Sequence, residues 1–238
     1  MATPGPTGQM PSAPPQGSPR RVRRVLVLAF DTATPAVTVA VSRSHQVLAE
    51  WSAVDPRRHG ELLAPGIERV LAQATIRPAD LTAIAVGVGP GPYTSLRVGV
   101  VTARTLGAVL GIPVHGVCTL DAIALDAVRL DPDLAGTPFV VATDARRREV
   151  YWARYEDGAR VEGPGVVKPA DLNWVGPVVG YGATLYPEHL PRGRAPEHAR
   201  AAAVAAHVEA GLPTLEPVPL YLRKPDATMP TVPRRVLA

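Results

Sequence analysis

The chain has 238 residues, of which 46% are apolar and one is a cysteine, Cys118, so it can bury a core and cannot close an internal disulfide. Its formal net charge is +4, but residues 1–24 contain four arginines and no acidic residue, so the remainder is neutral overall. Outside residues 1–24, the neutral balance argues against a protein whose whole surface attracts RNA through its net charge. No stretch reaches the roughly 18 apolar residues of a membrane span, and we expect a cytoplasmic protein. A lone cysteine is most often a small buried apolar residue, so Cys118 is not expected to be a nucleophile.

Residues 1–22 are dominated by proline, glycine, serine and threonine. Such a composition buries too little apolar surface to offset the chain entropy lost on ordering. We therefore expect a disordered extension, whose end overlaps the basic cluster Arg20, Arg21, Arg23 and Arg24.

Apolar runs and alternation predict three strands, at 25–30, 36–42 and 46–53, and Asp31 closes the first. A helical period over 58–75 is followed by a strand at 81–89, a helix at 94–110 and a strand at 112–117. The order β-β-β-α-β-α-β predicts an α/β fold.

A similar pattern starts at residue 138, where an apolar run again ends in an aspartate, Asp144, before a polar turn and an alternating strand. A strand at 159–167, a short helix at 169–174, a strand at 176–184 and a helix at 196–212 complete the expected elements. Two such units suggest a duplication, although two apolar runs ending in Asp also arise by chance. The arrangement is similar to the two-lobed actin, sugar-kinase and heat-shock ATPase superfamily, a duplicated ribonuclease H-like fold, in which these aspartates lie near metal-bound phosphates. We expect lobes at 23–118 and 119–238, with the C-terminal segment able to return to the first lobe.

The stretch "GVGPGPYTS" (87–95) has the order of a phosphate-binding loop, a strand followed by glycines and a helix start. However, Pro90 and Pro92 remove amide donors, and no lysine follows as in G-x-x-x-x-G-K-[ST]. As a nucleotide signal the loop is weak. If the cleft does hold a nucleotide, the candidate residues are Asp31, Thr32, Gly89, Gly91, Thr94 and Asp144.

The helix at 94–110 contains a stripe of small residues, Gly99, Ala103 and Gly107, spaced four apart. Each interior glycine costs about 1 kcal/mol relative to alanine, so close approach of another element is expected. That element can belong to the same lobe or to a partner. Thr94 or Ser95 is expected to cap the helix.

No metal or hydrolase constellation is present in the sequence. No two of the six histidines lie four apart, and neither H-E-x-x-H nor G-x-S-x-G occurs. We predict neither a metal site nor catalytic residues, and we expect His59 to cover the start of its helix.

Five stretches resemble the TsaB family, which is needed to place threonylcarbamoyl on the adenosine beside the anticodon of certain tRNAs. They are "LAFDTATPAVTVAV", "RRHGELLAPGIERVL", "GVGPGPYTSLRVGVVTARTLGAVLGIPVHGVCTLDAIA", "TDARRREVYWARY" and "PVPLYLRKPDA", in order from about residue 25 to 227. The resemblance implies a non-catalytic subunit with an actin-like fold, an obligatory paralogous partner, TsaD, and a small ATPase, TsaE. It implies no cofactor of the chain's own, with ATP or ADP and magnesium in the complex, and contact with tRNA through that complex. The two histidines by which TsaD binds its metal align here with Gly116 and Leu120, which cannot be ligands.

The family also implies pairing with TsaD, or a homodimer, through the helices at 58–75 and 94–110. The resulting interface candidates are Leu62, Leu63, Ile67, Val70, Leu71, Arg97, Gly99, Ala103 and Gly107. Pro92 and Ser95 depart from the Ser and Gly common in the family, which weakens any nucleotide contact at the loop. The alternative is a free-standing ATPase or kinase that uses Asp31 and Asp144 around magnesium phosphate.

Overall fold

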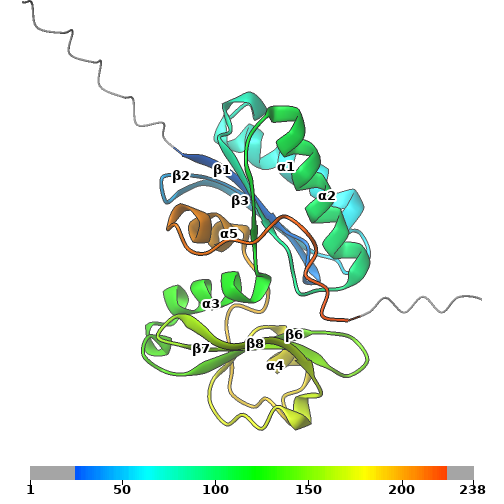
Figure 1. Ribbon diagram of the computed structural model, residues 1–238, viewed down its shortest axis with the longest axis vertical. Helices are drawn as coiled ribbons and strands as arrows, with labels where there is room; N and C mark the ends of the chain where they lie inside the picture. The colour runs from blue at the N-terminus through cyan, green and yellow to red at the C-terminus, as the bar shows by residue number, and fades with distance from the viewer. Residues whose placement is uncertain (1–24, 224–238) are drawn as a thin grey trace, which may run out of the picture.

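The computed structural model describes residues 25–223, which form two lobes, each built on a five-stranded sheet (Figure 1). The expected extension and its arginine cluster lie outside the described residues. In the first sheet, β1, β2 and β3 are antiparallel neighbours, while β4 and β5 run parallel to β1. Its order is β3 (Gln46–Val54), β2 (Ala36–Arg43), β1 (Leu26–Asp31), β4 (Ala83–Gly87) and β5 (Val114–Val117).

The second sheet repeats this topology. Its β6, β7 and β8 are antiparallel neighbours, and β9 and β10 continue parallel to β6. The order is β8 (Ala159–Val167), β7 (Val150–Glu156), β6 (Phe139–Asp144), β9 (Val178–Val179) and β10 (Gly193–Arg194). The pattern that recurs from residue 138 is therefore a second copy of the first unit, and the expected two-lobed, duplicated α/β fold is confirmed.

Helices cover both faces of the first sheet. On one face lie α1 (His59–Ala74) and α2 (Tyr93–Leu110), and on the other lies α5 (Ala201–Glu209), although it follows the second lobe in sequence (Figure 1). Alanines of α5 meet Ala29 and Ala40 of the sheet, so small residues on both sides allow a close fit. The C-terminal part of the chain thus returns to the first lobe.

The second lobe carries shorter helices. Between the lobes, α3 (Thr119–Leu130) packs against α5 and β6, and α4 (Tyr181–Leu185) lies on β6 (Figure 1). Short 3-10 turns occur at Pro78–Asp80, Pro132–Leu134 and Pro169–Asp171. Among the described residues, no helix is both long and apolar enough to cross a membrane.

Several element predictions were wrong in extent. The helix α3 was not predicted, and the expected strand at 176–184 is a two-residue strand followed by α4. Gly180, with φ of 103°, ends that strand, and Gly182 lies directly against Ala142, so the chain turns into a helix there. The helix expected at 196–212 is formed only over Ala201–Glu209, and that at 169–174 is the 3-10 turn Pro169–Asp171.

Candidate functional site: the cleft between the lobes

A hollow of about 210 Å³ lies between the lobes. From the first lobe it is lined by the starts of α1 and α2, including His59 and Thr94. From the second lobe it is lined by Asp144 and Arg146, at the end of β6 and just after it. A ligand in this hollow would contact both halves of the molecule.

Asp31, at the end of β1, is fully buried. Its Oδ1 accepts a hydrogen bond from the Ala33 amide at 2.8 Å, and its Oδ2 accepts one from the Thr119 hydroxyl at 2.7 Å. Burial raises the pKa of this carboxyl to about 6, and the bonds from Thr119 and Ala33 oppose that rise. The Thr119 hydroxyl in turn accepts from the Gly89 amide at 3.1 Å. The Asp31 carboxylate is thereby bound to its own chain on both oxygens.

The glycine-rich loop is packed onto the turn that follows β1. A side-chain carbon at Gly87 would collide with the Asp31 carboxylate, and one at Gly91 would collide with the backbone of Ala33. Gly89 has a φ of 98°, in the left-handed region that favours glycine. The three glycines are therefore explained by close packing within the lobe.

Thr32 ties the loop to α2. Its hydroxyl donates to the Ser95 carbonyl at 2.7 Å and accepts from the Gly99 amide at 3.1 Å. The predicted cap is wrong, because α2 starts one residue earlier, with Pro92 as N-cap and no side-chain cap, and the Ser95 hydroxyl donates to the Pro92 carbonyl. Asp31, Thr32, Gly89 and Gly91 are thus engaged by other residues of the chain, whereas Thr94 is exposed and lines the hollow.

Asp144 occupies the corresponding position at the end of β6. Its Oδ1 accepts from the Arg146 amide at 2.8 Å, and its Oδ2 lies 3.5 Å from the Arg146 guanidinium. Three consecutive residues, Arg146, Arg147 and Arg148, have φ of 62°, 54° and 59° and exposed side chains. A left-handed conformation costs a non-glycine residue about 1–2 kcal/mol, so this arginine turn is a strained feature at the edge of the hollow.

The small stripe of α2 and the apolar face of α1 face inward. Gly99 lies against Thr32 and Gly107 against Val114, while Ala103 is fully buried. The apolar residues Leu63, Ile67, Val70 and Leu71 are buried in the core formed with β1 and β2. The prediction that these side chains form an interface is corrected here. They pack within the first lobe, because an amphipathic helix turns its apolar face to its own sheet. Leu62 is half-buried and Arg97 exposed, and a partner surface on these helices stays a prediction.

The C-terminal segment runs beside β5, and its residues Tyr221, Leu222 and Arg223 line a second hollow. Gly116 and Leu215 exchange backbone hydrogen bonds of 2.9 and 2.8 Å, and the Leu220 amide donates to the Val88 carbonyl at 2.8 Å. A side chain at position 116 would meet the carbonyls of residues 215 and 216 at 2.8 and 2.7 Å. Leu120 is fully buried in the core of the second lobe. Positions 116 and 120 therefore serve packing. Residues 25–223 contain no group of three acidic, histidine or cysteine side chains that could hold a metal.

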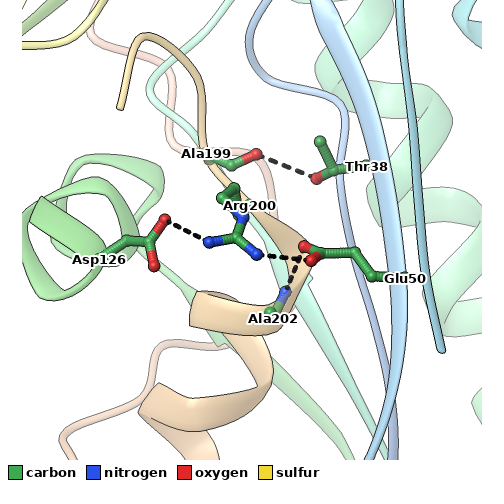
Figure 2. Close-up of polar contacts among 6 residues, drawn as sticks. All are labelled: Thr38, Glu50, Asp126, Ala199, Arg200 and Ala202. Carbon is green, nitrogen blue, oxygen red and sulfur yellow. Dashed lines mark hydrogen bonds and ion pairs between the residues drawn. The ribbon is translucent and has the colours of Figure 1, made fainter. Parts of the chain in front are cut away.

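A polar cluster between the lobes was missed from sequence. Arg200, just before α5, binds Glu50 of β3 at 2.7 Å and lies 3.5 Å from Asp126 of α3 (Figure 2). Glu50 also accepts from the Ala202 amide at 3.4 Å, and the Thr38 hydroxyl donates to the Ala199 carbonyl at 3.0 Å (Figure 2). Burial raises the pKa of the Asp126 carboxyl, while Arg200 lowers it. The cluster joins β3, α3 and α5, which lie far apart in the sequence.

Three further reactive side chains, Cys118, His59 and His207, are buried. Cys118 is buried, and burial raises the pKa of its thiol to about 12, so the group is neutral at physiological pH. His59 contacts the Thr34 carbonyl at 2.8 Å and His207 contacts the Pro213 carbonyl at 2.9 Å. His59 thus lies at the start of α1, as expected.

Two lobes of identical strand order, with an aspartate at the end of the first strand of each and a hollow between them, define a two-lobed fold of the actin and sugar-kinase type. The family model for TsaD, described as tRNA N6-adenosine threonylcarbamoyltransferase, matches residues 46–181. The chain belongs to this family and, within it, to the TsaB proteins.

Similar proteins include an uncharacterized protein of Mycobacterium tuberculosis, 48% identical over 87% of this chain and 96% of the relative. The tRNA threonylcarbamoyladenosine biosynthesis protein TsaB of Escherichia coli is 36% identical, over 55% of this chain and 54% of that protein. Among solved structures, a Pseudomonas aeruginosa protein described as similar to peptidase YeaZ has a TM-score of 0.71 and 27% identity. That match covers 84% of this chain and all of the other.

Proposed function

We propose that this chain is the non-catalytic subunit of the complex that makes threonylcarbamoyladenosine in tRNA, and that it pairs with and activates the catalytic TsaD subunit. Its family membership supports a role in this biosynthesis. Cytoplasmic localisation, association with TsaE and a homodimer of the unpartnered chain are parts of the same proposal.

One observation carries the proposal: the Asp31 carboxylate and the glycine loop of the first lobe are held by contacts within the chain. Both oxygens of Asp31 accept internal hydrogen bonds, and the glycines beside it are packed against Asp31 and Ala33. A carboxylate that binds magnesium phosphate needs an oxygen directed to the ligand. Gly116 of the first lobe and Leu120 of the second are also packing positions, so these observations support a chain that contributes a contact surface rather than catalytic groups.

The pairing surface is proposed on the outer sides of α1 and α2. Val101 and Val109 of α2 are 58% and 76% exposed, on the side of the helix opposite its buried residues. Apolar side chains with this exposure gain free energy when a partner covers them. ATP or ADP and magnesium are proposed to enter the complex through the other subunits.

The test is the transferase activity of TsaD, measured with and without the full chain. We expect little activity from TsaD alone and stimulation by this chain. The Val109→Glu variant should pair less tightly with TsaD, and Val161→Glu, on an exposed residue of the second lobe, serves as the control. Full activity of TsaD alone would remove the proposed role.

A calorimetric titration of the chain with ATP and magnesium separates this proposal from the free-standing ATPase. The scaffold predicts no binding that depends on Asp31. Micromolar binding that the Asp31→Asn variant abolishes would favour the enzyme instead.

A further inference from the structure

Two tyrosines stack on each other at the cleft, where the C-terminal segment meets the start of α2. The ring centroids of Tyr93 and Tyr221 are 5.0 Å apart with an interplanar angle of 21°, and the Arg97 guanidinium lies 4.8 Å from the Tyr93 ring centroid. Tyr93 is 43% exposed and Tyr221 39% exposed. Stacked rings with a guanidinium against them, open to solvent, can be extended by another flat group.

Arginines surround this stack. Arg57 and Arg146 line the hollow between the lobes, and Arg147 lines a second hollow beside it, together with Tyr93 and Tyr221. Of the described residues that line these two hollows, Asp144 is the one acidic side chain, and Arg223 is neutralised by Glu149. The cleft is thus locally positive in a chain whose net charge, outside residues 1–24, is zero.

The arginine turn strengthens this interpretation. Arg146 and Arg147 are exposed and hold left-handed φ angles that glycine or asparagine would adopt at lower cost. The turn is closed by backbone bonds from Ala145 to Glu149 and from Glu149 to Arg146, which any residue type could make. Neither backbone bond requires arginine. The Arg146 guanidinium also lies 3.5 Å from Asp144, and an anionic ligand in the cleft would give the exposed guanidinium groups of the turn a further partner.

We propose that Arg57, Tyr93, Arg97, Arg146, Arg147 and Tyr221, here termed the cleft-mouth face, bind an unpaired segment of RNA. An unpaired base extends the tyrosine stack, and the arginines bind the phosphates on either side. The inference rests on the proposed function and deepens it, because it assigns this chain a direct contact with a loop of the tRNA substrate.

The chemistry of the face favours RNA over other anionic partners. Base stacking on aromatic rings and guanidinium planes is the common way in which proteins hold unpaired nucleotides, and phosphate oxygens match the fork of arginine donors. An acidic peptide would use the arginines but gain little from the rings. A paired helix would offer phosphates but no base face, so the face should prefer loops to duplexes.

The experiment measures binding of a fluorescent RNA hairpin with an unpaired loop to the full chain, by anisotropy at low and near-physiological salt. Tyr93→Ala should weaken binding about tenfold, whereas Tyr93→Phe keeps the ring and should stay within about twofold. Arg146→Asn, which suits the left-handed turn, should weaken binding and lower the magnitude of the salt slope by about 0.7. Arg129→Gln removes an exposed arginine at the end of α3 and should leave affinity unchanged.

The proposal is overturned if Tyr93→Ala binds as tightly as the unchanged chain, which would mean that residues 1–24 or another surface carry the RNA. It is equally overturned if blunt duplex RNA binds as well as the hairpin, or if ATP with magnesium displaces the hairpin from the face at micromolar concentration. Urea unfolding of each variant separates loss of binding from loss of folding.

A second readout keeps this test distinct from the proposed function. With TsaD present, Tyr93→Ala should raise the KM for tRNA while pairing with TsaD and kcat remain unchanged. If the unchanged chain fails to stimulate TsaD, the proposed function falls, whether or not the hairpin binds. If stimulation is normal and Tyr93→Ala leaves the KM unchanged, only the RNA contact falls.

Discussion

The two lobes carry the same aspartate at the same place and use it differently. Asp31 and Asp144 each end the first strand of their sheet, and each accepts a hydrogen bond from the amide two residues later, at 2.8 Å in both cases. Asp31 is fully buried under its own loop, whereas Asp144 opens onto the hollow, beside the exposed arginine turn. Identical topology thus supports internal packing in one lobe and a charged surface in the other. The loop after the strand, rather than the strand order, decides the chemistry of each lobe.

The largest effect is expected from a substitution that disrupts the packing around Asp31 in the first lobe. In Gly87→Ala, the new methyl group would occupy the place of the Asp31 carboxylate and displace it from the Thr119 hydroxyl and the Ala33 amide. Overpacking costs about 1–3 kcal/mol, and unsatisfied buried groups add to it, so we expect a loss of about 3 kcal/mol or more in the free energy of unfolding, measured in urea. Gly60→Ala, where nothing lies within 4 Å of the new carbon, should cost nothing. Equal behaviour of the two variants would show that the loop is not tightly packed.

The next effect is a pH dependence that Asp31 alone should produce. The carboxyl titrates near 3.8 in the unfolded chain and at about 6 when folded, so the folded state holds the proton more tightly. The contribution of Asp31 to stability is therefore greatest below pH 4 and falls as pH rises to about 6, by up to about 3 kcal/mol. Urea unfolding from pH 4 to 7 should show the unchanged chain losing stability relative to Asp31→Asn. A constant difference between the two would contradict the burial argument.

A smaller loss is expected at the junction between the lobes. Arg200→Met removes the cation that joins Glu50 and Asp126 and leaves the nearly buried Asp126 carboxylate without it. Because Arg200 is itself 43% exposed, we expect about 1–2 kcal/mol of destabilisation rather than the larger cost of a fully buried pair. Glu50→Gln keeps an acceptor for the Ala202 amide and should cost less. The ranking is measured by urea unfolding, and the reverse order would mean that the Glu50 carboxylate contributes more to the junction than its pairing with Arg200 explains.

The sequence predicted the architecture of both lobes because it depends on periodicity. Apolar runs that end in Asp31 and Asp144 identify the two units, and the first-lobe strands and helices lie close to their predicted places. The short pieces of the second lobe, such as α4, were misread because glycine contacts with β6 decide them. The repeated apolar run that ends in aspartate indicated Asp31 and Asp144, and the glycine loop indicated Gly89, but neither pattern indicated the internal bonds that these residues make.

The interface prediction shows that a sequence pattern cannot distinguish packing within a lobe from contact with a partner. An apolar stripe on a helix is equally suited to a sheet of its own lobe and to a partner, and here Leu63 and Val70 face the sheet. The stack of Tyr93 on Tyr221 and the pair of Arg200 with Glu50 each join residues more than a hundred positions apart, so no local pattern indicates them.

The smallest effect is expected at the exposed arginine turn of the second lobe. Arg148 is the third residue of the arginine turn, with φ of 59°, and its side chain is exposed. Asparagine adopts the left-handed region at lower cost, so Arg148→Asn should raise the free energy of unfolding by about 0.5 kcal/mol. Arg192→Asn removes the same charge from an exposed residue that lacks a positive φ and should bring no gain. A gain in stability from this one substitution would show that the Arg148 side chain is not needed to fold the turn. Destabilisation by Arg148→Asn would instead mean that the guanidinium itself holds the turn in place.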